Sequence, residues 1–278
     1  MRFLVTNDDG VFSPGLAAIV EVLQQYGEVN VVCPNQDKSA AGHSITLLKP
    51  LYVYETSVFG ENVKAWTVNG TPADCVKMAL EVLLPNEIDL VVSGMNMGSN
   101  TGRDIYYSGT IAGAREASFF KIPAIAVSLD IFNEDLTDFS PSKKLFSNVL
   151  ETILSKQYTS NLLLNINIPH IDETQYKGIR FAELDYSIHQ YKLNEVIEPS
   201  GPVYYLLKDH QMQLPLTTST SDIILLQQGF ITVTPLEVRL TDQNYTSENE
   251  SFSSFSTLAT YESEGRNPFS IKTSSVCK

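Results

Sequence analysis

Short apolar runs alternate with amphipathic stretches from the start of the chain to about residue 170. Between residues 15 and 26, Leu16, Ile19, Val20 and Leu23 recur at the spacing of one helix face. The same reasoning predicts strands over residues 3–5, 29–33, 88–92, 124–128 and 162–168, extended segments within 51–68, and helices over 71–84, 110–118 and 142–154. This alternation predicts an α/β fold: a Rossmann-like, three-layer α/β/α arrangement around a mostly parallel, doubly wound sheet.

The pattern changes after residue 177, where strand-like pieces surround one short helix. They lie at residues 179–184, 203–207 and 230–234, with the helix near 222–228. From Thr241 onward Ser, Thr, Asn and Glu dominate, which predicts a poorly packed tail. We therefore expect one domain over residues 1–240, made of an α/β core (1–177) and a β-rich extension (178–240), followed by a polar tail (241–278).

Composition narrows the class of protein. The 278 residues are 43% hydrophobic, enough for a substantial core. The net charge is -13, and no stripe of Lys and Arg occurs, which argues against a nucleic acid or an anionic membrane as partner. Cys33, Cys75 and Cys277 are scattered, which predicts reduced thiols, the first two in the core. Without an apolar run of membrane-span length or room for a signal peptide, a cytoplasmic protein is expected.

The first apolar run, Phe3-Leu4-Val5, ends after Thr6 in Asn7-Asp8-Asp9-Gly10. In open α/β folds the carboxyl end of a strand is where ligands bind. Two ionised carboxylates about 4 Å apart repel by roughly 4 kcal/mol at an effective dielectric near 20, so the pair needs a proton, a cation or separated side chains. An isolated Asp-Asp-Gly is more often a solvated turn, and the neighbouring loops decide between the two interpretations.

Two further loops follow predicted strands, one carrying Ser39 and the other Asn96. In a doubly wound sheet these strand ends converge on the switch point, where Asp8 and Asp9 also lie. Carboxylate, hydroxyl and amide oxygens suit Mg²⁺, Mn²⁺ or Ca²⁺ rather than zinc. The topology therefore predicts a site for one hard divalent cation.

A stretch rich in small and polar residues, 93–110, supplies a second element. Its end, Ser108-Gly109-Thr110, opens a predicted helix, and the free backbone N–H groups of a helix N-terminus bind phosphate well. The alternative is a flexible loop, but loops this long in compact domains are usually functional or disordered. A cation beside a phosphate cradle indicates phosphoryl chemistry.

Other functions fit less well. A dinucleotide-binding site would need GxGxxG in the first turn, where two acids would instead repel a pyrophosphate. An aspartyl-phosphate phosphatase also has acids after its first strand, but spaced as DxDx(T/V) rather than adjacent, so it stays a weak alternative. A protein that binds nucleotides through a metal without turning them over is a third possibility.

In combination, the motifs resemble the SurE family of metal-dependent nucleotidases over about residues 1–240. The resemblance is carried by Thr6-Asn7-Asp8-Asp9-Gly10, Pro14-Gly15, Ser39, Val68-Asn69-Gly70-Thr71-Pro72-Ala73-Asp74, Ser93-Gly94-Met95-Asn96, Tyr107-Ser108-Gly109-Thr110 and Val233-Thr234-Pro235-Leu236. It implies hydrolysis of nucleoside 5'- and 3'-monophosphates, with some activity on short polyphosphate. It also implies one divalent cation per subunit and a homodimer or homotetramer built through the C-terminal extension.

The resemblance assigns the cation to Asp8, Asp9, Ser39 and Asn96, the residues that the topology gathers. We expect Asp8, Asp9 and Asn96 to be catalytic, with Asp9 slightly favoured over Asp8 as the acceptor of a proton from the attacking water. Phosphate would be bound by Ser108, Gly109 and Thr110, and His43, Asn69 and Tyr107 are candidate substrate contacts.

This chain departs from the family pattern at three positions. Ala40 follows Ser39 where many relatives have Gly, which predicts a slightly tilted loop. Arg239 and Gln243 stand where many relatives have an acid and a His near the end of the domain. Neither role is transferred to this chain, so the general acid for the leaving alcohol is unassigned.

Overall fold

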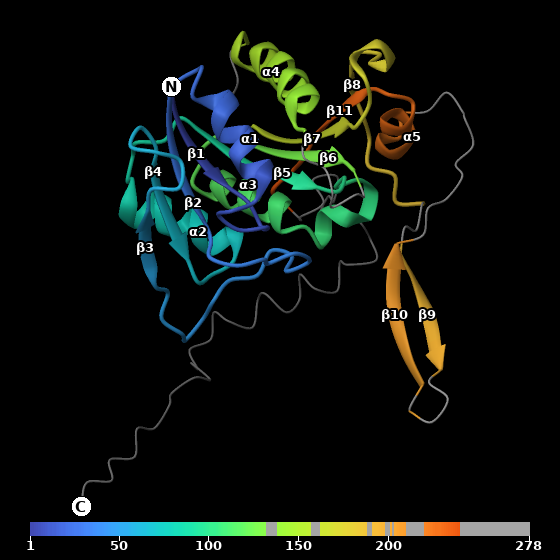
Figure 1. Ribbon diagram of the computed structural model, residues 1–278, viewed down its shortest axis with the longest axis horizontal. Coiled ribbons are helices and arrows are strands. Elements are labelled where there is room, and N and C mark those ends of the chain that lie inside the picture. Colours follow the sequence, from blue (N-terminus) through green and yellow to red (C-terminus); the bar gives the residue numbers. More distant parts are fainter. Residues whose placement is uncertain are drawn as a thin grey trace, which may run out of the picture. The chain divides into compact units, whose positions relative to one another are not determined.

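Figure 1 shows the computed structural model, which describes residues 1–131, 138–156, 162–187, 191–197, 201, 203–209 and 220–239. Residues Met1–Val238 form one compact unit. The tail predicted over residues 241–278, with Cys277 and Gln243, lies outside the described part. Cys33 and Cys75 are free thiols buried in the core, as predicted.

A nine-stranded sheet forms the centre of the unit, in the order β3-β4-β2-β1-β5-β6-β7-β11-β8. All neighbouring pairs are parallel except β3 with β4 and β11 with β7. The strands are β1(Arg2–Thr6), β2(Glu28–Pro34), β3(Val53–Thr56), β4(Lys64–Val68), β5(Leu90–Met97), β6(Ala124–Asp130), β7(Leu163–Pro169), β8(Ile179–Phe181) and β11(Ile231–Pro235). The strand order runs outward from β1 in both directions, so the predicted doubly wound sheet is confirmed, with its switch point beside β1.

Helices cover both faces of the sheet and complete the three layers (Figure 1). On one face α1(Pro14–Leu23) and α4(Ser140–Leu154) bury an apolar core that includes Phe3, Leu16 and Phe146. On the other face α2(Pro72–Met78) and α3(Gly109–Phe119) bury a second core. Strands buried on both faces explain the continuous apolar runs in the sequence.

The ends of several predicted elements differ from the structure. The helix predicted over 71–84 is α2 followed by a π-helical turn, η1(Ala79–Leu83). The stretch after β5 contains a 3₁₀ turn, η2(Gly102–Tyr106), which a 3.6-residue period does not reveal. Strand β9(Tyr191–Ile197), which pairs with β10(Val203–Asp209), was not predicted because polar residues interrupt its apolar positions. In the described residues no helix is long and apolar enough to span a bilayer.

Part of the segment predicted as a separate extension belongs to the main sheet. Strand β11 pairs with β7 and β8, and its Ile231 and Val233 side chains are buried in the same core as Phe146. The sequence pattern predicts a strand at residues 230–234. It does not place that strand in the main sheet, because β11 runs antiparallel to β7 and does not continue the strand–helix alternation. The sheet therefore extends past the boundary predicted at residue 177.

The buried carboxylate of Asp222 ties the C-terminal third of the unit to the loop after β5. Asp222 is the first residue of α5(Asp222–Gln227). Its carboxylate accepts hydrogen bonds from the backbone N–H groups of Gly102 (2.7 Å), Asp185 (3.1 Å) and Ile223 (2.9 Å). Burial raises the pKa of Asp222, and the three N–H groups oppose that rise. This one side chain holds three separate segments in register.

We expect Asp222→Ala to lower the free energy of unfolding by about 2 kcal/mol, because it leaves buried N–H donors without an acceptor. Denaturant unfolding monitored by circular dichroism measures this loss. Asp172→Ala, at an exposed aspartate, is the control and should unfold as the native chain does. Equal midpoints for the two variants would contradict the anchoring role of Asp222.

Candidate active site

Asp8 lies two residues after the end of β1 and is 4% exposed. Its Oδ1 accepts a hydrogen bond of 2.5 Å from the Thr110 hydroxyl, and the Thr110 backbone N–H also lowers its pKa. Burial is the larger effect and raises the pKa of Asp8. A side chain at Gly109 would place its Cβ only 2.7 Å from the Asp8 Cβ, so the glycine lets α3 begin directly against this carboxylate.

Asp9 is half-buried and faces a pocket of about 390 Å³. The pocket is also lined by Phe12 from the loop after β1, by Asn35 from the loop after β2 and by Met97 at the end of β5. Burial, followed by the charges of Asp8 and Asp37, raises the pKa of Asp9 to about 7. Asp9 is therefore the carboxylate that a ligand in the pocket would meet, and its pKa lies near neutrality.

The loop after β2 brings Ser39 to the same edge of the sheet. Its register is set by Lys38, whose backbone N–H donates to the backbone carbonyl of Asp8 at 2.7 Å. Ser39 donates from its backbone N–H and its hydroxyl to Asp37 Oδ1, both at 2.6 Å. Because the hydroxyl proton points at Asp37, the lone pairs of the Ser39 oxygen remain available to a cation.

Asp37 is a residue of the site that the sequence analysis missed. Its charge contributes to the raised pKa values of both Asp8 and Asp9. The only available signal was its position two residues before Ser39, in a loop already assigned to the site. A third carboxylate increases the electrostatic benefit of a cation at this position.

Asn96 lies near the end of β5, next to β1 in the sheet. The pairing of β5 with β6 shifts register between Gly94 and Asn96, and such a bulge redirects the side chain that follows it. Asn96 Nδ2 donates to the Gly98 carbonyl at 2.7 Å, which leaves the amide oxygen as a free acceptor. The backbone here is closely packed, because a Cβ at Gly15 would lie 2.0 Å from the Met95 carbonyl oxygen.

The donor set fits a hard divalent cation better than a soft one. Asp8, Asp9, Ser39 and Asn96 offer only oxygen atoms, the ligands that Mg²⁺, Mn²⁺ and Ca²⁺ prefer. No group of three or more His, Cys, Asp or Glu side chains in the described part of the chain could hold a metal. A cation here would thus rely on two carboxylates and two neutral oxygens, and it would offset the mutual repulsion of the carboxylates.

The predicted phosphate-binding residues differ in which of their hydrogen-bond donors are available to a phosphate. Ser108 caps α3, accepting a hydrogen bond from the Ile111 N–H at 3.1 Å. Thr110 is engaged with Asp8 through its hydroxyl. A phosphate at this helix end would therefore meet the Ser108 hydroxyl and the Gly109 N–H, while Thr110 orients Asp8.

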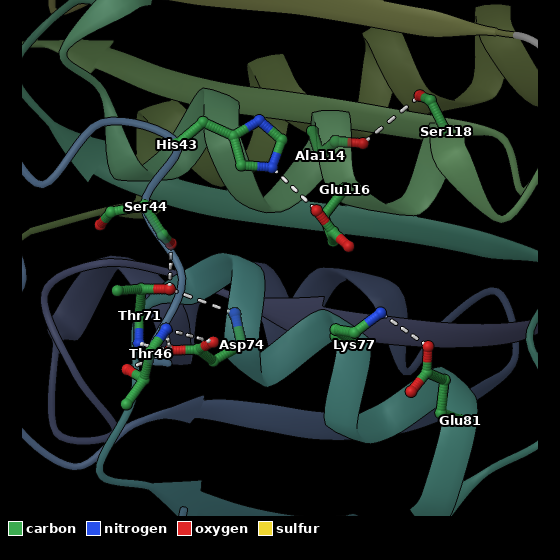
Figure 2. A network of polar contacts seen from close by, with 10 residues as sticks. All are labelled: His43, Ser44, Thr46, Thr71, Asp74, Lys77, Glu81, Ala114, Glu116 and Ser118. Atoms are coloured by element: carbon green, nitrogen blue, oxygen red, sulfur yellow. Dashed lines mark hydrogen bonds and ion pairs between the residues drawn. The ribbon is translucent and has the colours of Figure 1, made fainter. Parts of the chain in front are cut away.

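His43 is directed at α3 rather than at the phosphate-binding end of that helix. Its Nε2 lies 2.8 Å from Glu116 Oε2 (Figure 2). Its ring also stacks on that of Phe119, with 5.7 Å between the centroids. Glu116 is seven residues beyond Gly109, which places it roughly 10 Å along the helix. His43 therefore attaches the loop after β2 to α3.

The same loop is held a second time against α2. Thr71 and Asp74 form the capping box that begins this helix. Asp74 also accepts from the Thr46 N–H (3.0 Å) and hydroxyl (2.7 Å), and the Thr71 hydroxyl donates to the Ser44 carbonyl at 2.7 Å (Figure 2). The residues that cap α2 therefore also hold the loop that carries Ser39 in place.

The other two candidate substrate contacts, Asn69 and Tyr107, both form hydrogen bonds that hold loops in place. Asn69 Oδ1 accepts from the Tyr52 N–H at 2.6 Å, which is a structural hydrogen bond. The Tyr107 carbonyl accepts from the Gly42 N–H at 2.8 Å, whereas its side chain is 57% exposed. Of the three candidates, only the Tyr107 ring is free to meet a ligand.

Comparison with known proteins gives a consistent result. The model of the family described as Survival protein SurE matches residues 3–190. The 5'-nucleotidase SurE of Moorella thermoacetica is 41% identical over 255 residues, covering 92% of this chain and 97% of the relative. The protein of the same name from Carboxydothermus hydrogenoformans is 38% identical over 250 residues, covering 89% and 94%. The crystal structure of the SurE protein from Aquifex aeolicus superposes with a TM-score of 0.74 at 32% identity, covering 93% and 100%.

We expect Thr110→Val to weaken Mn²⁺ binding by about tenfold, because residues that orient a metal ligand typically contribute 10–100-fold to affinity. Isothermal titration calorimetry measures the affinity directly. Thr152→Val is a matched control, since the Thr152 hydroxyl bonds only to its own helix at the Asn148 carbonyl. Unchanged affinity in Thr110→Val would show that Asp8 needs no such support.

Asp9→Asn should stabilise the metal-free protein by about 2 kcal/mol at pH 8. The folded-state pKa of Asp9 is about 7 against an ordinary value of 3.8, so the native chain loses stability as pH rises through that interval. The variant has no carboxylate to ionise and keeps its stability. Thermal unfolding in excess chelator at pH 4 and pH 8 tests this, with Asp172→Asn as the control. A variant less stable than the native chain at pH 8 would contradict the conclusion that the ionised Asp9 destabilises the metal-free fold.

Proposed function

The chain belongs to the SurE family, and from this we propose that it is a divalent-cation-dependent phosphomonoesterase that hydrolyses nucleoside 5'- and 3'-monophosphates to nucleoside and phosphate. The observation that carries the proposal is the junction of Asp8 with the start of α3, where the Thr110 hydroxyl and Gly109 bring a helix N-terminus against a carboxylate pair. Acids alone would repel a phosphate. Acids that hold a cation beside free N–H donors would bind one.

Asp8, Asp9, Ser39 and Asn96 would hold the cation. When bound, it would withdraw charge from a phosphoryl oxygen and acidify a water molecule. Asp8, buried and bonded to Thr110, is fixed in orientation and suited to ligation. The oxygen of Asn96, freed by the bond from its own nitrogen to Gly98, would add a neutral ligand without more negative charge.

Asp9 is the residue best suited to accept the proton of the attacking water. It lines the pocket that a substrate would enter, and its carboxylate could accept a proton from a water molecule there. The Ser108 hydroxyl and the Gly109 N–H would donate to phosphoryl oxygens as negative charge grows on them. No described side chain is assigned to protonate the leaving alcohol, so water is the proposed donor.

Family membership also supports short polyphosphate as a second substrate and a homodimer or homotetramer as the assembly. The C-terminal extension offers a suitable surface for association. Hairpin β9–β10 exposes Leu193, Tyr205 and Leu207, each more than half accessible to solvent. Burying such side chains between subunits would favour the oligomer.

Release of phosphate from a panel of nucleoside 5'- and 3'-monophosphates, with Mg²⁺, Mn²⁺ or excess chelator, tests the proposal. We expect cation-dependent turnover that falls by about 10³-fold in Asp9→Asn, since a general base typically contributes 10²–10⁴-fold. Asp172→Asn, far along the chain and exposed, serves as the matched acid-to-amide control. Absence of release with every cation, together with retained nucleotide binding, would instead indicate a nucleotide-binding protein without turnover.

A further inference from the structure

The loop between β5 and α3, residues 98–108, joins Asn96 to the helix end that carries Ser108 and Gly109. Its position therefore controls both a proposed cation ligand and the proposed phosphate donors. Asn100 lies in this loop and is only 6% exposed, buried against strands that come later in the chain. The contacts of Asn100 show what holds the loop in place.

Asn167 on β7 bonds to the backbone of Asn100 with both ends of its amide. Its Oδ1 accepts from the Asn100 N–H at 2.7 Å, and its Nδ2 donates to the Asn100 carbonyl at 3.1 Å. Asn165, also on β7, donates to the same carbonyl at 2.7 Å, and Asn100 Nδ2 donates to Ser128 on β6 at 2.8 Å. The side chain of Asn167 thus engages the peptide group of the loop as a neighbouring strand would.

This polar cluster lies on a buried face of the sheet. Ser128, Asn165 and Asn167 are fully buried, and the register sets Thr232 and Thr234 of β11 opposite Asn167 and Asn165. Asn165 Oδ1 and both threonine hydroxyls have no hydrogen-bond partner within the described ranges. Buried polar groups are unfavourable unless bonded, so five of them on three adjacent strands carry a stability cost that apolar residues would avoid.

The cluster has one outcome that apolar residues could not supply: it fixes the backbone of Asn100. Two residues later the Gly102 N–H is bound by Asp222 at 2.7 Å, so the loop is held at two points from the C-terminal part of the unit. Both points lie between Asn96 and Ser108. The spacing between cation ligand and phosphate donors is therefore set by β6, β7 and α5.

We propose that Asn167, assisted by Asn165 and Ser128, is a positioning residue for the reaction, acting through the backbone of Asn100. The inference rests on the proposed function. A displacement of about 1 Å at a remote support can lower a rate roughly 100-fold, so loosening this loop should lower kcat while the acids themselves stay in place.

Asn167→Leu tests the proposal, because leucine keeps a similar volume and removes both hydrogen bonds. The matched control is Asn30→Leu, the same change at a buried asparagine of β2. Unlike the Asn167 Oδ1, the Asn30 Oδ1 has no hydrogen-bond partner within the described ranges. The measurements are kcat and KM for the best nucleoside monophosphate, the melting temperature, and hydrogen exchange of peptides covering residues 98–108.

For Asn167→Leu we expect kcat to fall roughly 10- to 100-fold and exchange in residues 98–108 to rise, with exchange in β1 unchanged. Asn30→Leu should keep the native kcat and loop exchange. Equal kcat in Asn167→Leu and the native chain, or equal losses in both variants, would overturn the proposal. If Asn167→Leu does not fold, Asn167→Ser, which shortens the side chain and keeps a polar group, takes its place under the same criteria.

The exchange measurement keeps this inference separate from the proposed function. If the native chain releases no phosphate from any nucleotide, the proposed function fails. Faster hydrogen exchange of residues 98–108 in Asn167→Leu alone would then still support the role of Asn167 in holding this loop. Unchanged exchange would refute that role.

Discussion

Repulsion between the adjacent carboxylates of Asp8, which is buried, and Asp9, which is half-buried, is the constraint on which the rest of this edge of the sheet depends. Each charge raises the free energy of the fold, and Asp37 adds to the effect. A chain selected for stability alone would replace one of the pair. The Thr110 hydroxyl stabilises the charged form of Asp8, and the proposed cation would offset the remaining repulsion between the two carboxylates.

The loops around these acids are irregular in backbone but firmly tied. The segment after β2 is bonded to Asp8, to Asp74 at the start of α2 and to Glu116 on α3. The segment after β5 is bonded to β6, β7 and α5. Sites built on loops need such supports, because small displacements weaken ligation and catalysis. Asp74 at the start of α2 and Asp222 at the start of α5 therefore also hold the loops of the site in place.

Much of the fold and of the site could be predicted because the relevant signals are local. An apolar run that ends in Asp8 and Asp9, and a helix that begins at Ser108, are each visible within a few residues. Topology then gathers them at one edge. The contribution of Asp37 and the bond from Thr110 to Asp8 arise only when separate loops meet. Strand β11 escaped assignment to the core for the same reason, since its partners β7 and β8 precede it by many residues.

The place of β11 between β7 and β8 also affects how the chain is made. During synthesis on the ribosome, β1 to β7 emerge first, but the outer edge of β7 has no strand to pair with until Pro235 has been added. Strand β8 emerges earlier yet has its only sheet neighbour, among the described strands, in β11. An unpaired edge of this kind is a site for misassociation between nascent chains. Completion of the sheet therefore waits for β11, the last strand in the described part of the chain.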